Sequence, residues 1–195
     1  MLDSLDNLMV INWVGFGISK DLYRLPCSVP ANNDRTVRWQ IMTTDSPLED
    51  WHFLIGQWKG RSTDQFGETG ELESIIKLTL ELGRRAIMGI YETKQNDKII
   101  NQEISVLFFD VLNKVFRRKS FFSYGFVTNE VSYEHSSTAL RFDITFEPLP
   151  TQFKGTRWCS FITKVSPTQI LEGLEQAKKG EDFKLYGEVQ LEKVS

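Results

Sequence analysis

Ten short runs with the side-chain alternation of β-strands fill the chain from residue 57 to the C-terminus. In the clearest run, mostly apolar residues at even positions from Leu72 to Leu82 alternate with polar residues such as Glu73 and Lys77. This pattern is typical of an antiparallel strand with one buried face. The links between runs are of hairpin length, so the sequence predicts an all-β barrel or sandwich of about ten strands. The runs are 57–62, 71–82, 86–93, 99–109, 115–122, 126–134, 139–146, 155–165, 169–177 and 182–193.

One of these runs has a second interpretation. Residues 171–179 have a composition that also suits a short helix. The alternation favours a strand in this part of the chain, and the composition leaves the helix open.

The first run begins with the motif Gly56-Gln57-Trp58-Lys59-Gly60. A Gly-x-Trp at the start of a long antiparallel meander resembles the calycin superfamily of lipocalin and fatty-acid-binding barrels. The resemblance is closest to the nitrobindin-like, lipocalin-related family, and it covers roughly residues 47–194. It implies a closed calycin-like barrel in which Trp58 plugs one end and a small ligand occupies the cavity above it.

The same resemblance implies a basic side chain over the plug. In calycin barrels a cation from a late strand commonly covers the tryptophan in a cation–π contact. Arg157, Lys184 and Lys193 are the late candidates, and their spacing does not choose among them.

Residues 47–55, directly before the motif, predict a short capping helix. Leu48, Trp51, His52 and Ile55 are spaced i, i+3, i+4 and i+7, which places them on one face of an α-helix. We expect this apolar face to close one end of the barrel and Gly56 to end the helix.

Residues 1–41 differ from the rest and predict an N-terminal extension to a barrel domain that spans residues 42–195. Prolines and a polar run, 31–35, indicate irregular structure, and Met42 precedes the capping helix. We expect this extension to be flexible or dispensable. The alternative is an ordered strap in which Trp13, Phe16 and Trp39 pack on the barrel.

Composition excludes several classes of partner. The chain of 195 residues has a net charge of −3, which provides no basic surface for nucleic acid and no polybasic membrane patch. No apolar run approaches the roughly 18 residues of a membrane span. Cys27 and Cys159 form no zinc or redox motif, and we expect a reducing, cytoplasmic location. The sequence does not determine the oligomeric state.

The cofactor prediction depends on a missing histidine. Nitrobindin-like proteins bind haem through a histidine near the start of the final strand, whereas residues 182–189 contain none. Tyr186 is the one side chain there that could ligate iron. His52 and His135 are far apart in the sequence and belong to no carboxylate cluster, so no metal site is predicted. We therefore expect no haem and no other cofactor.

The basic triplet Arg117-Arg118-Lys119 lies within a predicted strand. Because neighbouring strand residues face opposite sides, either Arg117 or Arg118 points inward, and the register is open. An inward arginine suits a carboxylate through two parallel hydrogen bonds. The alternative is that both arginines lie on the outer face, in solvent.

Other polar residues in apolar strands are candidates for the binding site. Tyr91, Glu103, Tyr133 and Tyr186 could supply the few polar groups of a mainly apolar pocket. We expect a carrier or sensor of a small, mostly apolar ligand rather than an enzyme, and the sequence leaves an acidic head group on this ligand open. Two alternatives stay open. One is a catalytic barrel, either a haem protein or a small-molecule isomerase or cyclase. The other is a structural or interaction domain whose interior is filled by phenylalanines: Phe108, Phe109, Phe121, Phe122, Phe142 and Phe161.

Overall fold

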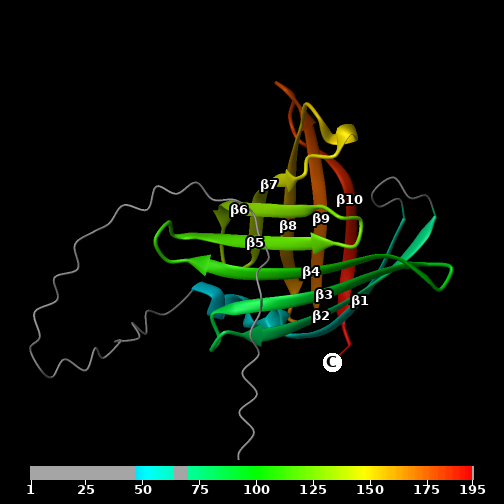
Figure 1. Cartoon of the computed structure of the whole chain (residues 1–195). Coiled ribbons are helices and arrows are strands. Elements are labelled where there is room, and N and C mark those ends of the chain that lie inside the picture. Colours follow the sequence, from blue (N-terminus) through cyan, green and yellow to red (C-terminus); the bar gives the residue numbers. More distant parts are fainter. Residues whose placement is uncertain (1–46, 64–69, 195) are drawn as a thin grey trace, which may run out of the picture. The chain divides into compact units, whose positions relative to one another are not determined.

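The computed structural model describes residues 47–63 and 70–194, and these form a closed antiparallel β-barrel of ten strands (Figure 1). Each strand pairs with its neighbours in the chain, and β1 pairs with β10 to close the barrel. The all-β, ten-stranded prediction is therefore confirmed. The strands are β1 (Gly56–Thr63), β2 (Glu71–Glu81), β3 (Ala86–Gln95), β4 (Lys98–Asp110), β5 (Val115–Phe122), β6 (Val127–His135), β7 (Ala139–Glu147), β8 (Thr156–Ser166), β9 (Gln169–Lys178) and β10 (Lys184–Lys193).

The segment for which the sequence left both a strand and a short helix open is a strand. It forms β9, which pairs with β8 on one side and β10 on the other. The hydrogen bonds of two neighbouring strands outweigh a weak local preference for helix, as tertiary context commonly does. The expectations for residues 1–41 and for a boundary at residue 42 lie outside the described residues and stay predictions.

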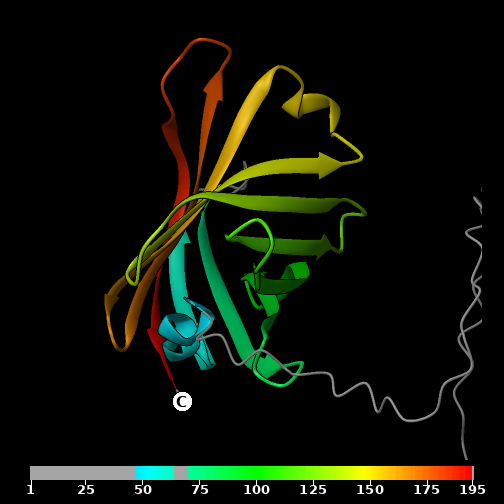
Figure 2. The same cartoon turned by 90° about the vertical axis from the view of Figure 1, so that its left-hand side faces the viewer.

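Two short 3₁₀-helices lie at opposite ends of the barrel: η1 (Pro47–Leu54) at one end and η2 (Thr151–Phe153) at the other (Figure 2). The predicted capping helix exists, but its buried face differs from the prediction. Leu48, Trp51 and Leu54 are buried, whereas His52 and Ile55 are only half-buried. A 3₁₀-helix has three residues per turn instead of 3.6, so positions i, i+3 and i+6 share a face.

Trp58 plugs the η1 end of the barrel. Its ring is fully buried, and its Nε1 donates a hydrogen bond of 2.6 Å to the Leu54 carbonyl. The Nζ of Lys193 lies 5.4 Å from the ring centroid and donates to the Phe53 carbonyl at 2.8 Å. Among the three late cations, Lys193 is therefore the one that covers the plug. It pairs with Trp58 across the β1–β10 closure.

The second glycine of the motif is needed at the same closure. A Cβ on Gly60 would overlap the backbone carbonyl oxygen of Gln190 on β10. The Gly-x-Trp-x-Gly phrase thus encodes both the plug and the close approach of the first and last strands.

The barrel interior near η1 is packed with apolar side chains. A void of about 10 Å³ lies between this core and Arg118, and it holds at most about one water molecule. Of the six phenylalanines named for a packed interior, Phe109 and Phe142 pack in this core. The core consists of Leu48, Trp51, Leu54, Trp58, Ile76, Leu78, Ile87, Leu107, Phe116, Leu140, Phe142, Ile162, Ile170, Val189 and Leu191, with Phe109 partly buried against it.

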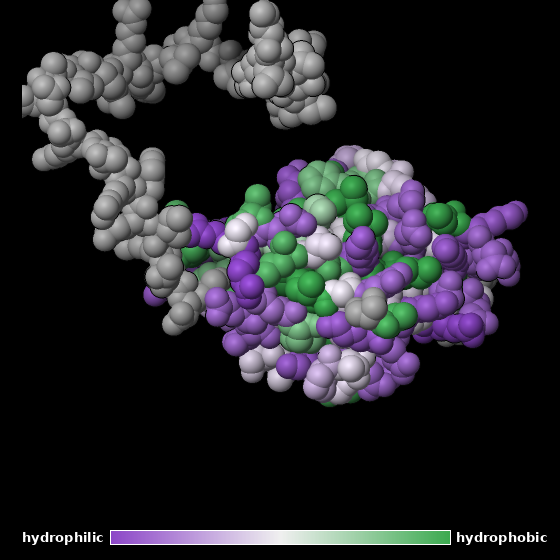
Figure 3. Space-filling view, turned by 90° about the horizontal axis from the view of Figure 1, so that it is seen from below, coloured by the Kyte–Doolittle hydropathy of each residue, from purple (hydrophilic) through white to green (hydrophobic). Residues whose placement is uncertain are grey.

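The outer surface mixes hydrophilic side chains with exposed apolar ones, as the view from below shows (Figure 3). Scattered apolar residues are ordinary on protein surfaces. No helix within residues 47–63 and 70–194 is long and apolar enough to cross a membrane.

Candidate functional site

Arg118 lies inside the barrel, between the packed core and a cavity. On β5, Phe116, Arg118 and Ser120 face inward and are buried, whereas Arg117 faces outward. The open register is thus settled, since Phe116 belongs to the plug core and its i+2 neighbour must share its face. Arg117 instead forms an ion pair with Asp110 at 2.7 Å on the outer face.

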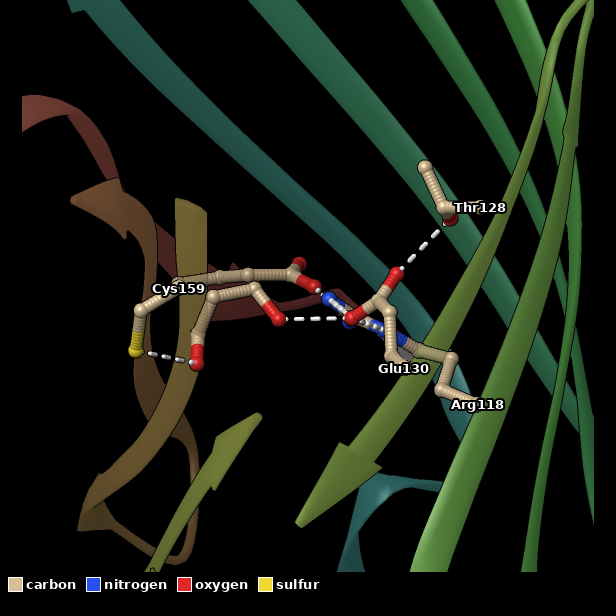
Figure 4. A network of polar contacts seen from close by, with 6 residues as sticks. Arg118, Thr128, Glu130 and Cys159 are labelled. Carbon is tan, nitrogen blue, oxygen red and sulfur yellow. Dashed lines mark hydrogen bonds and ion pairs between the residues drawn. The ribbon is translucent and has the colours of Figure 1, made fainter. Parts of the chain in front are cut away.

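Arg118 is held by two carboxylates from other strands (Figure 4). Its Nε donates to Glu130 on β6 at 2.9 Å, and its Nη1 donates to Glu172 on β9 at 2.6 Å. Thr128 and Ser160 donate further hydrogen bonds to Glu130, at 3.0 and 2.6 Å. These five residues form a polar layer across the barrel, which we call the arginine layer.

Arg118 keeps its positive charge despite burial. Burial works against the charge of Arg118, but Glu130 and Glu172 outweigh it and raise the Arg118 pKa well above its usual value. Burial also raises the pKa of Glu172, and Arg118 opposes that shift. The guanidinium is therefore saturated with carboxylates from the protein itself.

Beyond the arginine layer, on the side away from Trp58, the barrel is hollow. A cavity of about 120 Å³ borders Arg118, Glu130 and Glu172. It shares lining residues with a recess of about 460 Å³ next to η2. The recess alone falls within the roughly 300–1,000 Å³ of small-molecule sites. The shared residues are Thr93, Asn101, Phe122, Phe126 and Phe153.

Aromatic rings form one continuous wall of this cavity. Phe126 stacks on Phe122 at 4.6 Å between centroids, and the Trp158 ring meets Tyr186 edge-on at 4.9 Å. Trp158 is 5% exposed, and its indole N–H has no hydrogen-bond partner among the described residues. The aromatic wall consists of Phe122, Phe126, Phe146, Phe153, Trp158 and Tyr186.

Glu103 lines the cavity from β4 and forms no ion pair with a described residue. Burial raises its pKa to about 7, although the nearby positive charge of Arg118 partly opposes the shift. Tyr91, its cross-strand neighbour on β3, also lines the cavity. Burial raises the Tyr91 pKa, so its hydroxyl stays protonated. Glu103 is thus a carboxyl group of the cavity whose charge changes near neutral pH.

The structure brings most of the sequence-predicted site residues together. Arg118, Tyr91, Glu103 and Tyr186 all line the cavity. Tyr133 does not: it is half exposed on the outer face, beside a β-bulge, and contacts the Cys159 sulfur at 3.1 Å. Ser132 is buried on the inner face of β6, so Tyr133, the next residue in the strand, faces outward.

Sequence reasoning missed Glu130 and Glu172, which hold the arginine. Their signal was present, because Thr128, Glu130 and Ser132 alternate with outward residues in β6, and Glu172 falls between apolar inward residues of β9. A carboxylate on the inner face of a strand indicates a buried partner. Within the described part of the chain, no group of three potential ligands could hold a metal ion.

Glu103 predicts a pH-dependent stability. Because its folded pKa is raised, Glu103 is neutral in the folded protein at low pH. Its ionisation then destabilises the fold as pH rises from about 4.5 through 7. We expect Glu103→Gln to gain on the order of 1–3 kcal/mol relative to wild type between pH 5 and pH 8. Urea unfolding of ligand-free protein at both pH values measures this. A stability difference that is the same at both pH values would contradict the raised pKa of Glu103.

Together these features define a closed ten-stranded barrel with one packed end, a buried charged layer and an aromatic-walled cavity. No protein-family model and no curated protein matches the chain. Among solved structures it is similar to Rv2717c from M. tuberculosis, with a TM-score of 0.56 and 14% identity over 76% of this chain and 98% of that one. This likeness shows the barrel fold and is consistent with the calycin-like prediction.

Two further solved structures show weaker similarity. The S-type phycobiliprotein lyase CPES from Guillardia theta has a TM-score of 0.47 and 14% identity over 76% of this chain and 92% of that one. The protein EF1p2_mFAP2b, bound to DFHBI, has a TM-score of 0.34 and 13% identity over 77% of this chain and all of that one.

Proposed function

We propose that this protein binds one small, mostly apolar molecule in the cavity beyond the arginine layer and carries or senses it. The observation that carries the proposal is the division of the barrel. Its η1 end is filled with tightly packed side chains, whereas the η2 end has open space with an apolar wall and a few polar groups. Such a pocket is the usual form of a small-molecule site. We also propose that the protein is related to the nitrobindin-like barrels.

The aromatic wall favours a flat, conjugated body for the ligand. Ring faces and edges gain from contact with another ring beyond simple area burial. The acidic head group expected from the sequence has weaker support. Arg118 already binds Glu130 and Glu172, so a ligand carboxylate would have to compete with two carboxylates that are built into the protein.

Filling the cavity tests the proposal. Ile144 faces the cavity between Glu130 and Trp158 on neighbouring strands, and its neighbour Thr145 is exposed on the outer face. We expect Ile144→Trp to weaken the binding of Nile red, a neutral fluorescent dye, by at least about tenfold. Thr145→Trp, the matched control, should leave it unchanged. Circular dichroism checks that both variants keep the barrel, since overpacking typically costs about 1–3 kcal/mol. Equal binding by both variants would place the dye outside the barrel.

Haem binding remains the alternative that the family resemblance raises. The cavity lining includes Tyr186 but neither His52 nor His135. We expect added hemin to give no saturable, stoichiometric shift of the Soret band. A saturable shift that Tyr186→Phe abolishes would replace the carrier proposal with a haem protein.

A further inference from the structure

The charges around the cavity do not balance. Of the residues that line it, Arg118 is the one with a basic side chain, and four are buried or half-buried glutamates: Glu92 on β3, Glu103 on β4, Glu130 on β6 and Glu172 on β9. Two of them, Glu130 and Glu172, are bound to the arginine. Of the other two, Glu92 accepts a hydrogen bond from Gln102, and Glu103 has no cation of its own among the described residues. A ligand that enters this cavity therefore meets an excess of negative charge.

The aromatic wall adds to the preference for positive charge. Aromatic faces attract cations, most strongly those of tryptophan. Trp158 lies in this wall, and its buried N–H lacks an acceptor from the described residues. A ligand that supplies a hydrogen-bond acceptor would satisfy that donor. The cavity thus presents a carboxylate acceptor, a ring wall and one unsatisfied donor.

We propose that the ligand is a flat aromatic cation whose protonated nitrogen binds Glu103, with its ring system held against the aromatic wall. This inference rests on the proposed function and specifies the class of ligand. A carboxylic acid fits worse, because it would add a further negative charge beside Glu103 and compete for Arg118. A charge-assisted hydrogen bond at a half-buried carboxylate is the interaction that selects the cation.

Glu103 also makes this selection depend on pH. Its surroundings are Tyr91 on β3, Arg118 on β5, Glu130 on β6 and Glu172 on β9. Tyr91 stays neutral and Arg118 stays charged near neutral pH. A cation favours ionised Glu103, so its affinity should fall as the pH drops from 8 to 6.

Three probes with similar ring systems test the inference on the full chain. They are 9-aminoacridine, which is cationic at pH 8, neutral anthracene, and anthracene-9-carboxylate, which is anionic. In fluorescence titrations at pH 8, we expect 9-aminoacridine to bind about tenfold to a hundredfold more tightly than anthracene, and the anion to bind least. Glu103→Gln should remove most of this preference and leave anthracene binding unchanged. Glu188→Gln, an exposed position on β10, is the matched control.

The outcomes separate this inference from the function on which it rests. Anthracene binding with no preference for the cation would overturn the inference and leave the carrier proposal standing. The tightest binding by the anion would also overturn it and favour an acid bound by Arg118. Failure of all three probes to bind would overturn the carrier proposal. Anthracene binding by Glu103→Gln shows that this variant keeps its fold.

Discussion

Replacing Trp58 with alanine should cost about 3–5 kcal/mol of unfolding free energy and leave the barrel barely folded. The ring is fully buried between η1 and the closing strands, and its loss would leave a cavity at the packed end. It would also leave the Leu54 carbonyl without its donor and Lys193 without the ring it covers. Urea unfolding followed by circular dichroism measures the loss.

Two further variants show where this stability comes from. Trp58→Phe keeps a buried ring but loses the hydrogen bond to Leu54, so it should cost less than Trp58→Ala. Lys59→Ala, next in the chain but exposed on the outer face, should change stability little. If Trp58→Ala keeps near-wild-type stability, Trp58 is not the plug and the account of the packed end is wrong.

Arg118→Met should cause the second large loss of unfolding free energy. It removes the cation that compensates Glu130 and Glu172, and breaking such a buried group typically costs about 3–5 kcal/mol. The loss should be smaller at pH 5 than at pH 8, because the stranded carboxylates then take up protons. Unfolding of wild type and variant at both pH values tests the prediction.

Matched variants show whether buried charge is the cause. Arg117→Met, its neighbour on the outer face, should have little effect because Arg117 is partly exposed. Adding Glu130→Gln and Glu172→Gln to Arg118→Met should recover part of the lost stability, since no buried charge then lacks a partner. An equal loss from Arg117→Met and Arg118→Met, or no recovery in the triple variant, would contradict the arginine layer.

The fold was predictable because its signals are local and repeated. Inward residues such as Ile76 and outward ones such as Lys77 follow a period of two through most strands, and hairpins leave few alternative pairings. The Trp58 motif then indicated which end of the barrel is plugged. The helix face was wrong at His52 and Ile55 because sequence spacing does not distinguish three residues per turn from 3.6.

The site was predictable only in part, because it depends on contacts between distant strands. Inward placement of Arg118 needed only the register of β5 once Phe116 was known to be buried. Its partner Glu172 is 54 residues away, and no local pattern joins the two. The misplacement of Tyr133 has a different cause: the prediction depended on its polar character within an apolar strand, whereas the alternation with buried Ser132 places it on the outer face.

The central claim is that the barrel interior beyond Arg118 holds a small molecule. Native mass spectrometry of the full-length protein, purified from its own host, tests this most directly when wild type, Ile144→Trp and Thr145→Trp are compared. We predict a bound molecule at one per chain in wild type and Thr145→Trp, and its loss in Ile144→Trp, where tryptophan fills the cavity. Retention of the molecule by Ile144→Trp, or wild-type protein that carries none, would contradict the claim.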